Sequence, residues 1–333
     1  MESMWSIYHE NVPEFIMEFA HTPAMLRLKG VGMHCGCEYA SFPEYVGTKP
    51  YSRWVHSVGV ALIVWHFTGD MAQAVAGLLH DVASPAFAHA IDFLHGDYIE
   101  QESTEEDTEE IIARSPELTV LLEKYALTVA QVSDYHMYPV ADNDSPRLSA
   151  DRLEYTLGNG LNHNICNLDE LRTIYNDLLV AENEEGQPEI QFRSPEHALR
   201  FARLSLTNSK VYASDGNRYS MQALAELLRD AIGAGLFAER DLYSTEPEVI
   251  GRLCADERLA ARWEKYTRYS ALKRSADYPD DGGYWLRLDA KRRSIDPRVL
   301  HSARVTALSA EYKAELDRFR TESYDYWLCA VEE

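Results

Sequence analysis

The sequence is poor in basic residues, in cysteines and in long hydrophobic runs. Lysine and arginine number 32 against 54 aspartates and glutamates, which gives a formal net charge of −22. A general positive field that could coat duplex nucleic acid or an anionic membrane is therefore excluded. Five scattered cysteines do not form a disulfide framework and fit a reducing compartment. The most apolar segment, residues 58–67, is far shorter than the ~20 residues that a membrane span needs.

The N-terminus also lacks the basic start and the long apolar stretch of a signal peptide. We therefore expect a cytoplasmic protein that binds neither membranes nor duplex nucleic acid. The excess of acidic residues does not exclude a small anionic ligand, because a few local arginine or lysine side chains are enough to bind one.

Runs of alternating β-branched residues are scarce, and apolar residues recur instead at helical spacing. Val58 and Leu62 lie on one helical face, and the leucines and isoleucine of residues 168–179 follow the same period. One short strand is predicted over residues 189–192, after a turn at 185–188. The pattern predicts a mostly α-helical fold.

The length of 333 residues and the ordinary content of 46% hydrophobic and 26% charged residues are typical of one large or two average globular domains. Because the sequence contains no linker of low complexity, we predict a helical domain over residues 1–235 and a C-terminal helical extension over 236–333 that packs on it. An acidic run at residues 100–110 indicates either a regulatory or metal-buffering strip or, as we favour, the solvated face of a loop and helix start.

The strongest local signal is the pair His80-Asp81, which follows an apolar helical segment that Pro85 must end. A neutral imidazole nitrogen and a charged carboxylate oxygen together suit Fe, Mn, Co, Ni or Zn. His56 near the start of an earlier helix and Asp151 near the start of a later one add two further donors. The sequence therefore offers four candidate metal ligands on three helices.

These four residues and their flanks resemble the signature of the HD-domain metal-dependent phosphohydrolases. The flanks are Phe42-Pro43, Arg53-x-x-His56-Ser57-x-Gly59-Val60, Ala76-Gly77-Leu78-Leu79-His80-Asp81, Pro85-x-Phe87-x-His89-x-x-Asp92 and Asp151-Arg152-x-x-Tyr155. In this extended form they look like the deoxynucleoside triphosphate triphosphohydrolase branch. Weaker similarity continues through residues 210–212 and 221–224, so the resemblance covers roughly residues 30–230.

The resemblance implies an all-α HD-domain fold with additional C-terminal helices and a nucleotide or a similar phosphorylated small molecule as substrate. One divalent transition metal would be held by His56, His80, Asp81 and Asp151, and Mg²⁺ could accompany the substrate phosphates. His89 would act near the α-phosphorus with Asp92 orienting it. The substrate-binding positions that the family implies are Arg53, Arg152, Tyr155, Lys210 and Tyr212. A homo-oligomer is a further expectation from the family.

The chemistry of the residues agrees with these roles. A bound divalent ion polarises phosphoryl oxygens and makes hydroxide available near neutral pH. His89 and Asp92 are three residues apart and share a helical face, as an orienting pair requires. Arg53 and Arg152 supply local positive charge for a substrate with several phosphates.

The chain departs from the family at three positions, because Ser84, Ile99 and Ser214 stand where relatives often carry histidine. Release of intact triphosphate from a deoxynucleoside triphosphate therefore competes with a phosphatase reaction on a mono- or diphosphate ester. A degenerate module that binds a nucleotide without turnover is the alternative of a different class. A redox enzyme with a di-iron site is a third, and it would need extra histidine ligands.

Two further groups of residues have both a functional and a structural interpretation. His136 could hold a second metal, but a surface histidine is favoured because no second histidine accompanies it at a useful spacing. The second group could form a zinc site from His34, Cys35, Cys37, His163 and Cys166. We favour buried thiols instead, because these residues lie far apart in the sequence and match no standard zinc finger.

Overall fold

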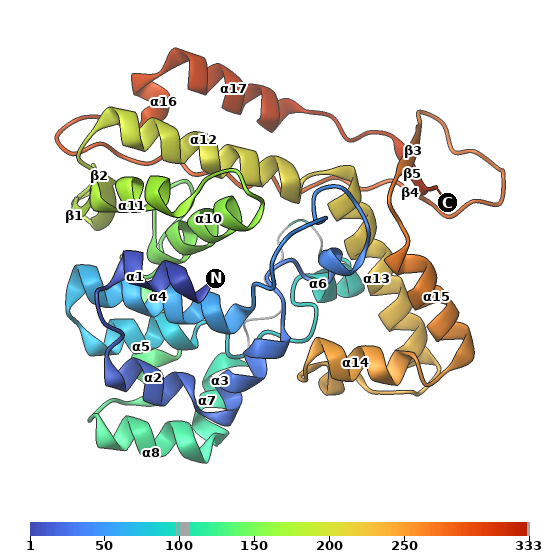
Figure 1. The fold of residues 1–333 in the computed structure, drawn as a ribbon, viewed down its shortest axis with the longest axis horizontal. Coiled ribbons are helices and arrows are strands. Elements are labelled where there is room, and N and C mark those ends of the chain that lie inside the picture. Colours follow the sequence, from blue (N-terminus) through green and yellow to red (C-terminus); the bar gives the residue numbers. More distant parts are fainter. Residues whose placement is uncertain (98, 100–106, 332–333) are drawn as a thin grey trace.

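We describe the protein from a computed structural model, which describes residues 1–97, 99 and 107–331. The chain is mostly α-helical with small sheets, as the sequence predicts (Figure 1). Of the acidic run at 100–110, residues 100–106 lie outside the described residues. No helix among the described residues is both long and apolar enough to cross a membrane.

Two helices, α4 (Arg53–Thr68) and α5 (Met71–Leu79), form the centre of the fold. The side chain of Ser52 caps the start of α4, and Gly69 ends it in the left-handed conformation (φ +61°) that glycine adopts without strain. The carboxylate of Asp70 then caps α5 by accepting a hydrogen bond from the third residue of the helix. Since α4 is apolar on all sides over much of its length, it must be buried rather than lie on the surface.

The two central helices approach each other closely at Gly77. A β-carbon there would lie 3.2 Å from Val60 Cγ1 and 3.3 Å from Val64 Cγ2 of α4, so a larger residue would push the helices apart. Three short helices pack directly on this pair: α1 (Trp5–Tyr8), α2 (Glu14–Ala20) and α9 (Val129–Val132). Outside them, α3 (Pro23–Leu26) and α8 (Pro116–Lys124) pack on α2, and α7 (Thr108–Arg114) packs on α9.

A second layer lies against α4 and begins with α10 (Ala150–Asn162), which also contacts α12 (Pro195–Tyr212). Between them in the chain come α11 (Leu168–Asn176) and an antiparallel hairpin of β1 (Leu178–Glu182) and β2 (Pro188–Phe192). The predicted strand at 189–192 is therefore confirmed. The predicted helix over 168–179 is wrong at its end, because its last two leucines pair with β2 as part of β1.

A third group of helices lies to the right in Figure 1 around α13 (Asp215–Gly233). It comprises α6 (Ala90–His95), α14 (Glu246–Leu253) and α15 (Glu257–Thr267). A separate hydrophobic core fills this part of the molecule, with Leu224 and Leu228 of α13 fully buried in it.

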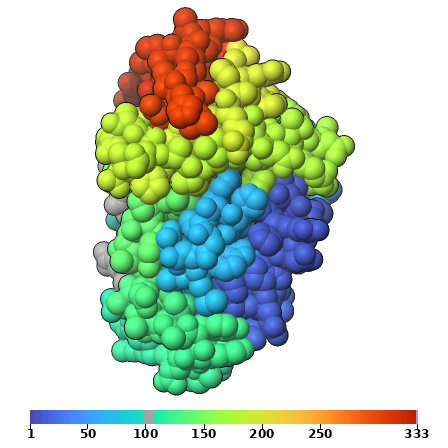
Figure 2. All heavy atoms as spheres, turned by 90° about the vertical axis from the view of Figure 1, so that its left-hand side faces the viewer, coloured from blue at the N-terminus to red at the C-terminus, as the bar shows by residue number. Residues whose placement is uncertain are grey.

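The C-terminal segment 236–333 adds α14 to α17 but also a sheet that helical periodicity does not predict. The strand order is β3 (Leu272–Ser275), β5 (Trp327–Ala330), β4 (Trp285–Leu286), and the remaining helices are α16 (Val305–Leu308) and α17 (Ala310–Thr321). Figure 2 shows α16 and α17 in red covering the yellow-green α12 segment. The segment contributes to both hydrophobic cores, and the domain boundary at 235 stays a prediction.

A buried ion pair joins the hairpin to the C-terminal segment. Glu189 of β2 has no solvent exposure, and Arg304 Nη1 and Nη2 donate to its two carboxylate oxygens at 3.0 and 2.9 Å. The backbone N–H of Leu148 and the side-chain amide of Asn183 donate to the same oxygens at 3.3 and 3.1 Å. The guanidinium supplies the countercharge that a buried carboxylate requires.

We expect Arg304→Met to lower the free energy of unfolding by about 3 kcal/mol, because it leaves the Glu189 carboxylate buried without a countercharge. Chemical denaturation measures this directly. The control is Arg298→Met, which removes a 2.9 Å ion pair to the partly exposed Glu184 and should lower the same quantity by less than ~1 kcal/mol. Equal effects of the two substitutions would show that the buried pair does not stabilise the fold.

Candidate metal centre and its cavity

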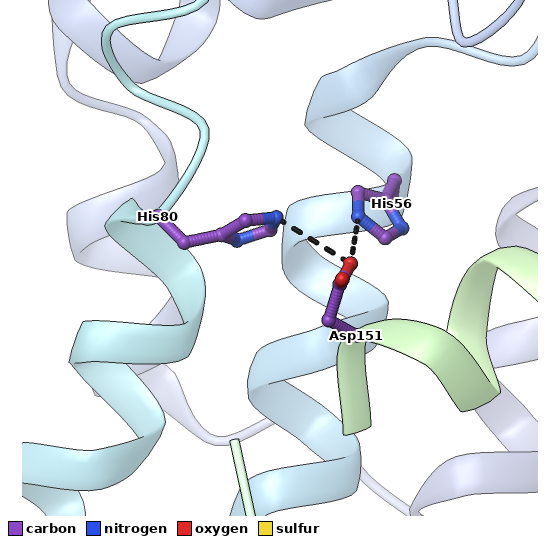
Figure 3. A group of neighbouring side chains, drawn as sticks. All are labelled: His56, His80 and Asp151. Atoms are coloured by element: carbon purple, nitrogen blue, oxygen red, sulfur yellow. Dashed lines mark ion pairs between the residues drawn. The ribbon is translucent and has the colours of Figure 1, made fainter. Parts of the chain in front are cut away.

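Three helix ends converge on one point. His56 lies near the start of α4, His80 and Asp81 directly follow α5, and Asp151 lies in the first turn of α10; in Figure 3 both imidazoles point toward Asp151. His56 Nε2 and His80 Nε2 lie 3.1 and 3.8 Å from Asp151 Oδ1. Asp81 Oδ2 lies 3.5 Å from His80 Nε2 and 3.9 Å from His56 Nε2. The structure therefore brings together all four predicted ligands.

These separations fit a single divalent ion. Ligand atoms that surround one ion with bonds of ~2.1 Å lie roughly 3 to 4.2 Å apart. Within the described part of the chain, His56, His80 and Asp151 form a group whose ligand atoms all lie within 4.8 Å of one another. Asp81 Oδ2 is buried and has no hydrogen-bond partner among the same residues, as expected of an oxygen that binds a cation. Two imidazoles and two carboxylates are a donor set for a divalent transition metal.

The second ring nitrogen of each histidine has an acceptor outside the cluster. His56 Nδ1 lies 2.5 Å from Glu154 Oε2, and His80 Nδ1 lies 2.8 Å from the carbonyl oxygen of Gly77. Since a carboxylate and a carbonyl only accept, Nδ1 carries the proton in both rings. Each Nε2 atom is thereby directed at the common point, where its lone pair would bind a metal in place of a proton.

The electrostatics of the cluster favour positive charge at that point. Burial lowers the pKa of His56, but hydrogen bonds to Asp151 and Glu154 outweigh burial and raise it to about 10. Burial raises the pKa of Asp81, but the charge of Arg53 and of the two imidazoles holds it well below its usual range. The Asp81 carboxylate therefore remains ionised and attracts a cation.

Glu154 is a site residue that the sequence analysis missed. Its side chain is 1% exposed and accepts hydrogen bonds from Tyr51 Oη at 2.5 Å and Tyr8 Oη at 3.4 Å in addition to His56. A β-carbon at Gly59 would lie 2.7 Å from Glu154 Oε1, which explains the glycine in the recognised motif. The sequence held one signal, because Glu154 follows Asp151 by three residues and shares its helical face.

Arg53 is buried beside Asp81 and makes an ion pair with its Oδ1 atom. Arg53 Nη1 also donates to Ser84 Oγ at 3.2 Å, and Ser84 Oγ donates to Asp81 Oδ1 at 2.8 Å. These contacts occupy Oδ1 and leave Oδ2 directed at the histidines. Ser84, one of the three departures from the family pattern, thus orients a predicted metal ligand, while the phosphate contact of Arg53 stays a prediction.

The ligand cluster lines a cavity of about 510 Å³, a size typical of small-molecule sites. Every predicted site residue lines it except Asp92 and Lys210. Lys210 is exposed on α12, whereas Tyr212 lines the cavity. Side chains two positions apart on a helix point in directions about 200° apart. The backbone that turns Tyr212 toward the cavity therefore turns Lys210 to solvent. The structure does not bring Lys210 to the site.

His89 enters the cavity from the turn before α6. Its neighbours Phe87 (φ +64°) and Ala88 (φ +40°) both have positive φ, a strained conformation that recurs at functional sites. His89 Nδ1 lies 2.9 Å from Asp92 Oδ2, and Asp92 is fully buried behind the ring. Burial lowers the pKa of His89, and Asp92 opposes that effect.

The predicted substrate-binding side chains on α10 and α12 line the same cavity. Arg152 Nη1 is held by Asp142 Oδ1 at 3.1 Å and by Asn143 Oδ1 at 2.9 Å. Tyr155 lies one helical turn further along α10. Tyr212 Oη accepts a hydrogen bond from Asn159 Nδ2 at 2.7 Å. Their contacts with substrate stay predictions.

The structure places the two alternative metal groups differently. His136 lines the cavity, half exposed, with Nδ1 3.0 Å from Asp134 and Nε2 3.5 Å from Asp142. His34 is buried, and its Nε2 is hydrogen-bonded to Asn162 Nδ2. No zinc cluster of histidines and cysteines forms among residues 1–97, 99 and 107–331.

The sequence analysis also missed a segment of the C-terminal region. Asp289, Ala290, Lys291 and Arg293 line the cavity beside the predicted residues. They lie outside the recognised motifs and outside any helix or strand, so neither spacing nor periodicity could indicate them.

Sequence comparison finds similar chains of nearly full length. The chain is 29% identical over 291 residues to the uncharacterized protein YdhJ of Bacillus subtilis, and the aligned region covers 85% of this chain and 83% of YdhJ. It is 22% identical over 292 residues to the metal-dependent phosphohydrolase cns2 of Cordyceps militaris, covering 85% of this chain and 80% of cns2. No protein-family model matches the chain.

Comparison with solved structures shows a shared fold. A phosphohydrolase from Bacteroides thetaiotaomicron superposes with a TM-score of 0.62 at 13% identity over 97% of both chains. A hypothetical protein from Aquifex aeolicus superposes with a TM-score of 0.64 at 16% identity over 96% of this chain and 93% of the other. These superpositions show a shared fold. The sequence similarity to cns2 supports the resemblance to metal-dependent phosphohydrolases, and the deoxynucleoside triphosphate branch stays a prediction.

We expect Glu154→Gln to weaken Mn²⁺ binding by roughly 10- to 100-fold, because the acceptor that fixes the His56 tautomer loses its charge. Titration of the metal-stripped protein with Mn²⁺ measures the dissociation constant, and circular dichroism checks the helical content. Asp92→Asn, which changes the buried carboxylate behind His89, is the control and should bind Mn²⁺ as the wild type does. An unchanged affinity in Glu154→Gln would remove Glu154 from the metal centre.

Proposed function

We propose that the protein is an HD-domain, metal-dependent phosphohydrolase that hydrolyses a phosphate ester or anhydride of a nucleotide or nucleotide-like small molecule. The observation that carries the proposal is the convergence of His56, His80, Asp81 and Asp151 at the wall of one cavity. The nearly full-length similarity to a protein named as a metal-dependent phosphohydrolase supports it.

The chain's own residues supply orientation and proton transfer. A divalent ion in this cluster would polarise a phosphoryl oxygen and lower the pKa of a bound water. Arg53 and Ser84 hold Asp81, and Glu154 holds His56, so the ligands do not need to reorganise.

His89 is the proposed acid–base residue. Its Nδ1–H donates to Asp92, which leaves Nε2 with its lone pair on the cavity side. Burial lowers the pKa of the ring, so His89 is neutral near pH 7 and accepts a proton there. Once protonated, it can donate that proton to the leaving group.

The specific substrate we favour is a deoxynucleoside triphosphate that loses intact triphosphate. Two of the three departures from that family's pattern have structural roles here. Ser84 binds Asp81, and Ser214 caps α13 by accepting a hydrogen bond from the backbone N–H of Asn217 at 3.2 Å. A phosphatase reaction on a mono- or diphosphate is the second candidate, since it needs the same metal site and no additional histidine.

Product analysis by phosphorus NMR tests the function. Purified protein with Mn²⁺ is incubated with nucleoside mono-, di- and triphosphates, with Asp151→Asn as the inactive variant. Asp144→Asn, which changes an exposed carboxylate on the preceding loop, is the matched control and should retain activity. Inorganic triphosphate as product would assign the triphosphohydrolase reaction, and orthophosphate the phosphatase. Bound metal without any product would contradict turnover and favour the binding module.

We expect His89→Gln to lower kcat by roughly 10²- to 10⁴-fold, the usual contribution of acid–base catalysis, without changing Mn²⁺ affinity. Asp92→Asn tests the positioning role through the pH profile. The Asp92 carboxylate stabilises the charged ring, so its removal lowers the pKa of His89 further and moves the acidic limb of the kcat profile to lower pH. An unshifted limb would separate Asp92 from the proton transfer.

A further inference from the structure

The C-terminal segment that lines the cavity consists of residues 288–296, which we name the strap. It has neither helix nor strand, and four of its residues line the cavity that holds the predicted metal ligands: Asp289, Ala290, Lys291 and Arg293. Neither the proposed metal chemistry nor the predicted substrate contacts use it.

Both ends of the strap are fixed to the body of the protein. The carbonyl oxygen of Leu288 accepts a hydrogen bond from Arg218 Nη1, and Arg218 is a buried side chain of α13. At the other end the backbone N–H of Asp296 donates to the carbonyl oxygen of Pro146 at 2.8 Å. Ile295 is 2% exposed in the main hydrophobic core. The strap therefore has a defined position over the cavity.

A turn in the strap separates its three cations. The backbone N–H of Arg293 donates to the carbonyl oxygen of Lys291 at 3.2 Å, and Lys291 and Arg293 line the main cavity whereas Arg292 does not. Arg292 Nη2 instead donates to the carbonyl oxygen of Glu322 at 2.7 Å, and its guanidinium lies 4.9 Å from the ring centroid of Tyr324. Two of the three positive charges are thus presented to the cavity.

The charge of the cavity differs from that of the chain. Histidines aside, the charged side chains that line it among the described residues are five cations, Arg53, Arg152, Arg218, Lys291 and Arg293, and four anions, Asp81, Asp142, Asp151 and Asp289. The chain as a whole carries −22, and two of the four anions are predicted metal ligands. The cavity therefore favours an anionic ligand, although the net negative charge of the whole protein repels one.

We propose that the strap binds the part of the substrate that carries its additional phosphates, with Lys291 and Arg293 contacting anionic oxygens beyond the phosphate nearest the metal ligands. The proposal rests on the proposed function and names its substrate class, a compound with two or more linked phosphates. Lysine supplies a point charge and arginine a planar pair of donors, both suited to phosphate oxygens. The strap thereby selects polyphosphate over monophosphate compounds.

Binding of inorganic triphosphate and of inorganic orthophosphate, measured by calorimetry, tests the strap without turnover. The variants are Lys291→Gln and Arg293→Gln, used with the metal that the purified protein retains. Each should weaken triphosphate binding by about tenfold or more and orthophosphate binding by less than about twofold, since each removes a charge-assisted contact. Arg287→Gln removes an exposed cation that pairs with Asp325 just outside the strap and should change neither affinity.

A conservative substitution separates binding from folding. Lys291→Arg should retain most of the triphosphate affinity, and all variants should keep the wild-type melting temperature. Triphosphate affinity that is unchanged in both glutamine variants, or that is absent in the wild type, would overturn the proposal. If the glutamine variants bind triphosphate as the wild type does and the protein hydrolyses nucleotides, only the proposed role of the strap is refuted. If the variants bind triphosphate more weakly but the protein hydrolyses no nucleotide, only the proposed function is refuted.

Discussion

Two carboxylates that face the same point both stay ionised only if positive charge lies between them. The buried Asp81 and the partly exposed Asp151 face the same pair of imidazole nitrogens. Arg53 neutralises one oxygen of Asp81 and leaves the other directed at the cluster. Glu154 adds a third carboxylate behind His56. The arrangement is consistent with a divalent cation, and the packing of α4, α5 and α10 holds these groups in place.

The cluster of four candidate metal ligands could be predicted from sequence because its signal is local. A His-Asp pair after an apolar helix, with a histidine and an aspartate at two other helix starts, depends only on residue type and helical boundaries. Glu154 was harder to find, because a glutamate on a helix is usually a solvent-exposed residue. Its burial results from contacts with residues more than 90 positions away, such as Tyr51 and His56, which no periodicity reveals.

The remaining differences arise from tertiary structure. Leu178 and Leu179 match a helical period, but their pairing with β2 places them in a strand. Lys210 shares its helix with Tyr212 and still faces solvent, because helical geometry separates the two side chains. The strap lies far along the chain from the motifs, and a segment without helix or strand has no pattern that predicts what it covers. Thus the mostly helical fold and the grouping of the four candidate ligands followed from the sequence, whereas the full cavity wall did not.

The account depends most directly on the position of the metal. Crystals grown with Mn²⁺ and measured at the manganese absorption edge locate the ion by its anomalous scattering. The account predicts one peak within bonding distance of His56 Nε2, His80 Nε2, Asp81 Oδ2 and Asp151 Oδ1, about 2.1 Å from each. A peak at another group of residues, or none at this cluster in crystals that contain saturating Mn²⁺, would contradict it.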